Sequence, residues 1–456
     1  MTATKVTAEL ADWIVGLEAS AIPAVVRKEG VRTFVNWVGC AVGGARHETV
    51  DCALAAVEPF SGPRQATVLG RGEKLDALHA ALLNGITSHV LDYDDTHLKT
   101  IIHPAGPVAS ALMALAEIRP LSGRDLLTAL IVGVEVECRI GNAVYPHHYD
   151  RGWHITGTAG VFGAAAAVGR AIGLDAQKMR WALGLAATQS AGLREMFGTM
   201  TKSFHPGRAA QNGAMAAFLA EAGFDSSEQV LEAPRGFAKV MSDKQDYGEI
   251  IDGLGIRWEA ALNSYKPFAC GIVIHPTIDG CQQIRAEIAA RVAEIEKVQL
   301  ITHPLVLELT GKTAPTTGLE AKFSVYHAAA CALLRGDGAP TAFTDEVVNA
   351  PEIVALRDRV KATADPACHE ASVTIEVTFQ DGSTLKKHVE RTLGSRERPL
   401  SDDQLETKFM NQAKLVIGEA PSRALLDLAW TIEDIDRAAA VAAASVPAAK
   451  LRNAAV

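Results

Sequence analysis

The sequence contains no C-x-x-C pair. Its seven cysteines are Cys40, Cys52, Cys138, Cys270, Cys281, Cys331 and Cys368. An odd number without close spacing argues against a disulfide framework, a zinc knuckle and a cysteine-ligated iron–sulfur cluster. The cysteine usage therefore favours a reducing, cytoplasmic compartment.

The sequence also lacks the segments that proteins use to cross membranes or to bind nucleic acid. No stretch reaches about 18 uncharged apolar residues, and the first 19 residues resemble an amphipathic helix with acidic residues more than a signal peptide. There is no dense run of Lys and Arg, and the formal net charge is -9. We therefore expect neither a membrane nor a nucleic acid as partner. An anionic substrate would need a local cluster of cations in a cleft.

Three motifs that carry common chemistries are missing as well. No G-x-S-x-G motif supports a serine hydrolase, and no H-E-x-x-H motif supports a metal site. The glycines of residues 157–163 (GTAGVFG) do not match G-x-G-x-x-G, and their spacing is typical of close helix packing. Adjacent histidines in residues 146–150 (PHHYD) point to different sides of the chain, so we interpret this segment as a solvated loop.

The chain of 456 residues exceeds the usual size of one hydrophobic core, so we expect two domains. Up to about residue 266, Ala, Leu, Gly and Val recur at helical spacing, for example in residues 105–117, 123–144 and 157–172. Because small residues let helices approach closely, this part predicts a tightly packed helical domain.

The pattern changes after Pro267. Segments with period-two alternation of Val, Ile and Thr predict strands at 297–302, 371–379 and 384–390, and Asp381-Gly382 predicts a hairpin turn between the last two. Helices are expected at 277–293 and 324–334. Residues 399–456 become helical again, with Ser401 and Gln404 as a capping start, and are expected to pack on the first domain. Residues 267–398 are thus expected to form a smaller α+β domain.

Two polar segments in the helical part suggest chemistry. Residues 91–97 (LDYDDTH) precede His103, and carboxylates beside an imidazole fix its tautomer and raise its basicity. His154 opens an Ala/Gly-rich helix, where the positive end of the helix suits an anion. The alternatives are a helix cap with a solvated loop for the first segment, and a buried, satisfied histidine for the second.

Two further segments contribute cations. Lys202, His205 and Arg208 fall within seven residues at a predicted helix start, where backbone N–H groups already favour an anion. Lys266 lies where the composition changes, a position that can line a cleft between domains. A basic surface loop and a linker lysine are the alternatives. The four segments together suit binding of carboxylates and transfer of a proton, and they supply no redox group or nucleophile triad.

The motifs LDYDDTH with the later HP, GWHITGT, GLREMFGTMTKSFHPGRAAQNG and SYKPFACGIVIHP, in this order, resemble the MmgE/PrpD family over roughly residues 8–430. The resemblance implies a mainly α fold: a large helical domain built from both chain ends (1–266 and 399–456) and a smaller α+β lid domain (267–398). It also implies a homodimer without a metal ion or organic cofactor.

The family resemblance also assigns residues. It implies an active site made of Asp92, Thr96, His103, His154, Lys202 and Lys266. Two positions depart from the family's decarboxylase pattern. His103 follows Thr96 at a spacing one residue longer, and Gly271 stands where that pattern has a histidine. His275 is a candidate substitute, and Arg208 a candidate substrate ligand.

From these residues we expect Lys202 and Lys266 to bind carboxylates of a small di- or tricarboxylic acid. His103 and His154 would act as base and acid, Asp92 would orient a histidine, and Thr96 would bind a carboxylate. The family resemblance favours a hydro-lyase like 2-methylcitrate dehydratase. An isomerase like iminodisuccinate epimerase, a cis-aconitate decarboxylase and a non-catalytic carboxylate-binding protein remain open.

Overall fold

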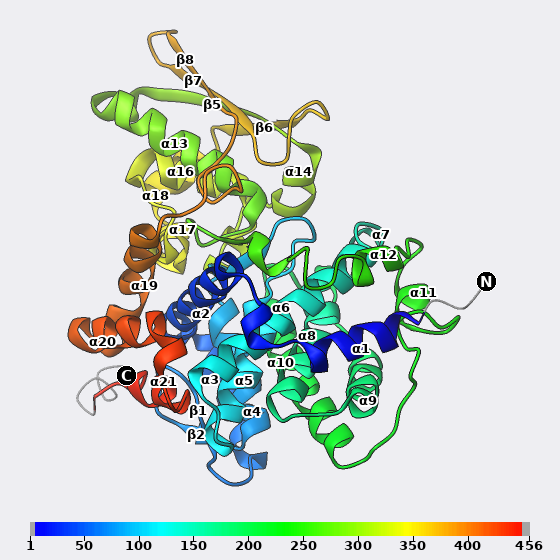
Figure 1. The fold of residues 1–456 in the computed structure, drawn as a ribbon. Coiled ribbons are helices and arrows are strands. Elements are labelled where there is room, and N and C mark those ends of the chain that lie inside the picture. The colour runs from blue at the N-terminus through cyan, green and yellow to red at the C-terminus, as the bar shows by residue number, and fades with distance from the viewer. Residues whose placement is uncertain (1–4, 449–456) are drawn as a thin grey trace.

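The computed structural model describes residues 5–448 and is mainly helical, as predicted. Figure 1 shows a large helical part below and a smaller α+β part above. Each part has its own cluster of buried apolar side chains. One cluster draws on residues 6–265 and 400–442, and the other on residues 268–389 together with Cys40 and Tyr93. We call residues 5–265 and 400–448 the helical part and residues 268–389 the α+β part; the predicted domain boundaries themselves stay a prediction.

Long helices form the centre of the helical part. They are α2 (Ala24–Gly44), α4 (Ala77–His89), α5 (Ala105–Ile118), α6 (Gly123–Val144), α8 (Ile155–Ala171) and α10 (Thr201–Glu221). Glycines allow them to approach closely: a Cβ atom added to Gly85 of α4 would lie 2.4 Å from the Cα atom of Gly207 in α10. On α8, a Cβ atom on Gly163 would lie 2.8 Å from the carbonyl oxygen of Gly133 in α6. The packing role predicted for the 157–163 glycines is thereby confirmed.

Shorter elements surround these helices. They are α1 (Val6–Gly16), α3 (Glu48–Val57), α7 (His147–Asp150), α9 (Ala176–Ala187), α11 (Phe237–Met241), α12 (Tyr247–Ile251) and the small ladder of β1 (Ala66–Thr67) with β2 (Lys74–Leu75). The interpretation of residues 146–150 as a solvated loop was wrong, because His148 and Tyr149 are fully buried. The His148 ring lies 3.0 Å from the hydroxyl of Thr158, an anchor on α8 that the local sequence does not reveal.

A four-stranded sheet lies at the top of the α+β part (Figure 1). Its order is β6 (Val360–Ala364), β5 (Ile295–Thr302), β7 (Val373–Phe379) and β8 (Thr384–Val389), with only the β5–β6 pair parallel. The three predicted strands are confirmed, and Gly382 takes a φ of 79° in the predicted hairpin. Strand β6 was missed because it is a short edge strand with one fully buried residue, Val360.

Helices cover one face of this sheet, and alternate residues of β7 are buried against them. The helices of the α+β part are α13 (His275–Ile288), α14 (Pro304–Thr310), α15 (Gly318–Ala321), α16 (Val325–Arg335), α17 (Asp345–Val348) and α18 (Pro351–Arg357). The predicted helix at 277–293 is confirmed in its first part only, since a 3-10 turn replaces it from Ala289 to Glu294. This packing hides one sheet face and leaves the other exposed.

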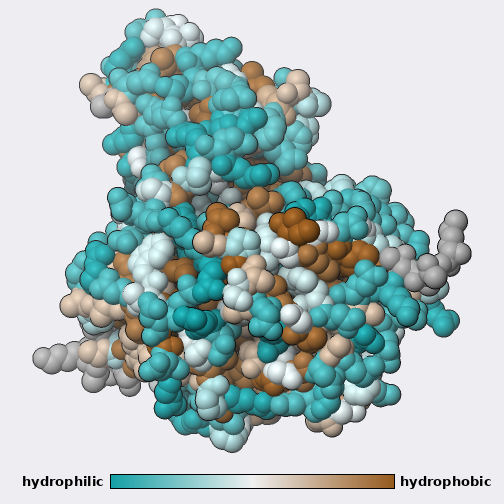
Figure 2. Space-filling view, in the orientation of Figure 1, coloured by the Kyte–Doolittle hydropathy of each residue, from teal (hydrophilic) through white to brown (hydrophobic). Residues whose placement is uncertain are grey.

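The last helices are α19 (Asp402–Ile417), α20 (Glu419–Trp430) and α21 (Ala439–Ala444). The predicted capping box is confirmed: Ser401 and Gln404 bond each other's backbone N–H groups at the start of α19. Phe409 of α19 fills the space over Gly39 of α2, where a Cβ atom would lie 2.7 Å from its ring. Within residues 5–448, no helix combines the length and apolar character needed to cross a membrane. In Figure 2 the outer face of the smaller part is largely hydrophilic.

Candidate active site

A two-stranded ladder brings two of the predicted segments together. Strand β3 (Asp95–His97) pairs antiparallel with β4 (Asn263–Tyr265), and Asp95 lies opposite Tyr265. Asp92 lies three residues before β3, and Lys266 directly follows β4. Residues 174 positions apart in sequence therefore face each other where the helical and α+β parts meet.

Asp92 contacts both predicted lysines. Its Oδ1 atom accepts a hydrogen bond from Lys266 and lies 3.1 Å from the Nζ atom of Lys202. All three side chains are buried. Burial alone would raise the pKa of Asp92, but the two ammonium groups hold it well below its usual value. Its Oδ2 atom has no hydrogen-bond partner, so one carboxylate oxygen stays available inside the site.

The two lysines differ in their surroundings. Burial lowers the pKa of Lys202 more than the Asp92 carboxylate raises it. For Lys266, the Asp92 and Asp94 carboxylates outweigh burial, so its pKa is raised. The Nζ atom of Lys202 also lies 5.3 Å and 5.4 Å from the ring centres of Phe197 and Phe323, which are the aromatic surfaces that a cation favours. Both lysines are placed to meet an anion.

The two predicted histidines also reach this place. The Nδ1 atom of His103 donates to the carbonyl oxygen of Asp95 over 2.8 Å and lies 3.2 Å from the Thr96 hydroxyl. His154 precedes α8, and its Nδ1 atom lies 2.8 Å from the Nδ1 atom of His205. Burial lowers the pKa of His103 and of His154 well below the usual value, and nearby positive charges add to this effect. Both imidazoles are therefore neutral near pH 7.

These side chains surround a cavity of ≈ 30 Å³ between the two parts. Its lining from the helical side and the junction consists of Asp92, Ile101, His103, Tyr149, His154, Phe197, Lys202 and Lys266. Its lining from the α+β part consists of Gly271, Ile272, Val273, Leu309, Thr310 and Phe323. The polar groups thus come from one side and a mainly apolar wall from the other. Two lining residues, Asp92 and Ile101, take positive φ angles of 50° and 61°, a strained conformation that the surrounding structure must hold.

Three predicted residues lie outside this cavity lining. Thr96 is buried in β3 behind His103 and contacts that ring. His275 is fully buried at the start of α13, with its ring against Phe268. Arg208 is exposed on α10 and bonds Gln211. The substrate-binding roles predicted for these three residues stay predictions.

Three further side chains beside the site were not among the predicted site residues. His89, at the end of α4, places its Nδ1 atom 2.6 Å from Asp94, and His205 contacts His154. Lys322, from the α+β part, is buried and lines a smaller cavity that also touches Asp92 and Lys202. His205 was noted in the Lys202 segment without a site role, although it follows Lys202 by three residues and so shares its helix face.

Buried lysines hold the backbone of the segment that carries Asp92. The carbonyl oxygen of Leu91 accepts from Lys322 over 2.8 Å, and that of Asp92 accepts from Lys266 over 3.2 Å. The next carbonyl oxygen, that of Tyr93, accepts from Lys408 of α19 over 2.6 Å. Three consecutive carbonyl groups therefore bind three lysines from different parts of the chain.

Among the described residues, one group of side chains could hold a metal ion. Ring nitrogens of His89, His103 and His154 lie within 4.8 Å of one another, and all three residues are buried. Neutral imidazoles are the usual protein ligands of zinc and related metals. The three histidines come from three separate segments, so no sequence motif predicts this cluster.

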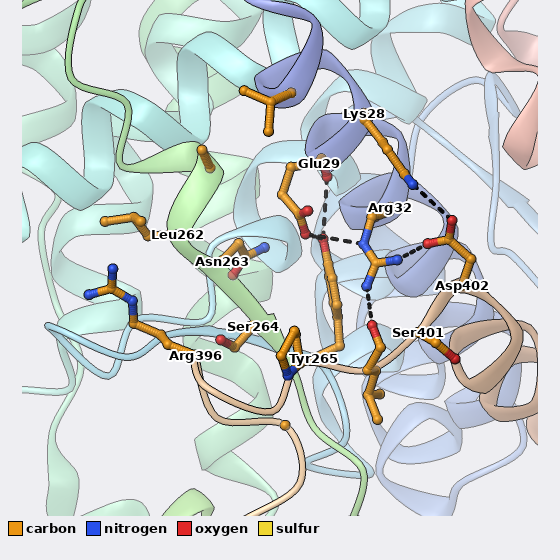
Figure 3. A pocket seen from close by; sticks show the side chains of 15 residues that line it. Lys28, Glu29, Arg32, Leu262, Asn263, Ser264, Tyr265, Arg396, Ser401 and Asp402 are labelled. Atoms are coloured by element: carbon orange, nitrogen blue, oxygen red, sulfur yellow. Dashed lines mark hydrogen bonds and ion pairs between the residues drawn. The ribbon is translucent and has the colours of Figure 1, made fainter. Parts of the chain in front are cut away.

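A larger cavity of ≈ 560 Å³ lies elsewhere, beside α2 and β4 (Figure 3). Four of its five charged side chains bind one another: Arg32 contacts Asp402 and Glu29, and Lys28 lies 3.0 Å from Asp402. The fifth is Arg396. No histidine lines it. Because it lacks a histidine and most of its charged groups bind one another, we place the candidate chemistry in the smaller, histidine-lined cavity.

Comparison with known proteins identifies the family. The family model described as the MmgE/PrpD N-terminal domain matches residues 8–250, and the MmgE/PrpD C-terminal domain matches residues 268–434. The chain is 28% identical to a cis-aconitate decarboxylase of Aspergillus terreus, covering 93% of this chain and 92% of the relative. It is 28% identical to the cis-aconitate decarboxylase of Homo sapiens, and the match covers 96% of this chain and 93% of the relative. It is 24% identical to a 2-methylcitrate dehydratase of Cupriavidus necator, and the match covers 80% of this chain and 81% of the relative.

Proposed function

The chain belongs to the MmgE/PrpD family, and on this premise we propose that it is a lyase that removes a proton next to a carboxylate of a small di- or tricarboxylic acid. One observation carries the proposal. Two buried lysines, Lys202 and Lys266, and two neutral imidazoles, His103 and His154, line the same cavity. Cations for carboxylates and a base for a proton are thereby combined in one place.

The chemistry requires this combination. A C–H bond next to a carboxylate is a very weak acid, because removing its proton places a second negative charge on the carboxylate. Fixed cations in a buried site stabilise that charge far better than water does. We assign this task to Lys202 and Lys266. The Asp92 carboxylate contacts both ammonium groups and opposes the lowering of their pKa values by burial.

The hydrogen bonds of the histidines suit them for proton transfer. His103 donates its Nδ1 proton to a carbonyl oxygen, so Nε2 is the atom that can accept a proton. The Nδ1 atom of His154 is hydrogen-bonded to the Nδ1 atom of His205. If His154 donates in this bond, its Nε2 atom can accept a proton; if it accepts, its Nε2 atom carries a proton and can donate it. We assign base and acid to these two rings, without fixing which is which. The negative charges of bound carboxylates would offset the lysine charges. They would thereby raise the pKa of both imidazoles toward neutral pH.

The cavity has to enlarge before a substrate enters. Its ≈ 30 Å³ equals roughly the volume of one water molecule in the liquid, whereas ligand pockets measure about 300–1,000 Å³. Phe197 of the helical part stacks on Phe323 of the α+β part, with ring centres 5.5 Å apart. We infer that the α+β part moves away to admit the acid and closes again to exclude water.

We propose dehydration, as by a 2-methylcitrate dehydratase, as the first choice of reaction. Gly271 supports this choice, because the family's decarboxylase pattern has a histidine here and the wall of the cavity at this point carries no side chain. Decarboxylation of cis-aconitate is the second candidate. It is favoured by the relatives of that name, which align with this chain over 93–96% of its length.

Proton NMR in heavy water distinguishes the reactions. Chelator-treated enzyme is incubated separately with 2-methylcitrate, citrate, cis-aconitate and iminodisuccinate. New alkene signals from a hydroxy acid support dehydration, itaconate from cis-aconitate supports decarboxylation, and deuterium uptake with inversion supports epimerisation. If no acid reacts or exchanges a proton, while tricarboxylates still raise the melting temperature, the protein is a carboxylate binder and the lyase proposal fails.

A further inference from the structure

Histidines from four separate elements gather beside the Asp92 segment. His89 ends α4, His103 precedes α5, His154 precedes α8 and His205 lies in the first turns of α10. The ring centres of His89 and His103 are 4.9 Å apart, and those of His89 and His154 are 6.0 Å apart. Four imidazoles within one buried space exceed what a base and an acid require.

In two of the rings, His89 and His103, the Nδ1 atom is hydrogen-bonded to an oxygen acceptor, which fixes Nε2 as the nitrogen with a lone pair. The Asp94 carboxylate lies beside the His89 ring, and a carboxylate accepts hydrogen bonds. His89 must therefore donate its Nδ1 proton to Asp94 over 2.6 Å, so its Nε2 atom carries a lone pair. That Nε2 atom is buried and has no hydrogen-bond partner. His103 is held in the same tautomer by the carbonyl oxygen of Asp95.

We propose that His89, His103 and His154 form a binding site for one divalent transition metal ion of the Zn²⁺ or Co²⁺ type, and that the bound ion inhibits the enzyme. Three neutral imidazoles and one water molecule are a common ligand set for zinc. One ring nitrogen from each histidine lies within 4.8 Å of the others. Tetrahedral coordination at about 2.0–2.1 Å places ligand nitrogens about 3.3 Å apart, so the rings need to move inward by on the order of 1 Å.

The surroundings of the cluster support a cation in two ways. A carboxylate that accepts the outer proton of a metal-bound histidine increases the basicity of that ring, and Asp94 already holds His89 in this manner. The charges of Lys202 and Lys266 oppose a metal ion, whereas Asp92 and Asp94 offset them. The expected affinity is therefore that of a reversible inhibitor, weaker than a structural zinc site.

Inhibition rests on the proposed function. A metal ion would take the lone pairs of His103 and His154 that proton transfer requires. It would also occupy space that the substrate carboxylates need, so metal ion and substrate should compete. Binding itself does not depend on the reaction and is measured without substrate.

The test measures metal binding by the full-length protein after chelator treatment. Zn²⁺ is titrated in competition with a chromophoric chelator, and Co²⁺ binding is followed by visible absorption. The variants are H89Q, H103Q, H154Q and D94N, and H327Q serves as the matched control because His327 is a buried histidine in α16, outside the cluster. Circular dichroism confirms that each variant is folded.

We expect one equivalent of Zn²⁺ in the wild type and in H327Q. Binding should weaken about tenfold or more in each histidine variant and about 10–100-fold in D94N, which retains all three ligands. No stoichiometric binding by the wild type, or equal affinity in H89Q and the wild type, would overturn the site. Binding without loss of turnover would overturn the inhibitory role, and an enzyme inactive on every acid that still binds Zn²⁺ would refute only the proposed lyase function.

Discussion

Lys266 donates hydrogen bonds to both the side-chain carboxylate and the main-chain carbonyl oxygen of Asp92. The same carboxylate also compensates Lys202. The substitution Asp92→Asn would leave two buried ammonium groups without the carboxylate that contacts them, a change that typically costs about 3–5 kcal/mol. We expect a loss of free energy of unfolding in this range at pH 7, measured by urea denaturation.

Citrate provides a second readout for this variant, because its carboxylates can replace the lost charge. We expect citrate to raise the melting temperature of Asp92→Asn more than that of the wild type. The control is Asp225→Asn, an exposed aspartate, which should change stability by less than about 0.5 kcal/mol. Equal stability of the wild type and Asp92→Asn would show that the lysines are not held charged by this carboxylate.

His154→Gln tests the proposed proton transfer. Loss of a general acid or base typically lowers turnover by about 10²–10⁴-fold, and we expect a fall of this size in the heavy-water NMR assay. The matched control is His327→Gln, which changes a buried histidine away from the cavity and should retain turnover within about twofold. Near-full turnover of His154→Gln would remove His154 from the mechanism.

The carboxyl group of Glu137 makes stability depend on pH. Glu137 lies in α6 against the glycines of α8, both of its oxygens lack hydrogen-bond partners, and burial raises its pKa well above the usual value. The folded protein must keep this group protonated, whereas the unfolded chain ionises it above about pH 4.5. As the pH rises from 4.5 to the pKa of Glu137 in the folded state, the free energy of unfolding of the wild type therefore falls by about 1.4 kcal/mol for each pH unit.

The variant Glu137→Gln removes this titration. We expect the wild type and the variant to be similarly stable near pH 4.5 and the variant to be more stable at pH 8, as measured by urea denaturation at both values. A stability difference that does not change with pH would mean that Glu137 does not titrate in the folded protein over this range.

Gly163→Ala tests the close packing of α8 on α6. The added Cβ atom would lie 2.8 Å from the carbonyl oxygen of Gly133, a backbone atom that cannot rotate away. Overpacking of this kind lowers the free energy of unfolding by about 1–3 kcal/mol, and we expect urea denaturation to show a decrease of this size. Gly16→Ala, at the end of α1 where a Cβ atom meets nothing within 4 Å, should leave stability unchanged or slightly higher.

The helical and α+β parts could be predicted because their residue patterns differ locally. Period-two alternation marked β5, β7 and β8, whereas β6 lacks it, since most of its residues are exposed at the sheet edge. The 146–150 segment was misread because local polarity does not reveal that α8 and α11 cover His148. The family matches confirm the resemblance found in the ordered motifs.

The sequence predicted which residues lie together in the candidate site for some of them and not for others. Asp92 and Lys266 were grouped by family resemblance, since no local pattern reveals a contact between residues 174 positions apart. Arg208 was included because it is near Lys202 in sequence. On a helix, however, residues six apart point about 120° away from each other, and Arg208 is exposed. His89 was missed because it ends a helix of ordinary apolar composition.

The lysines that bind the Leu91–Tyr93 carbonyl groups have a consequence for biosynthesis. Lys408 is 315 residues away from Tyr93, and Lys322 is 231 residues away from Leu91. During translation the Asp92 segment leaves the ribosome long before these two partners exist. Contacts of such sequence separation form late, because they carry the largest loop-closure entropy. A nascent chain arrested before α19 should therefore hold much of its helical part and still lack an ordered Asp92 segment, so that polycarboxylate binding begins only after α19 has emerged.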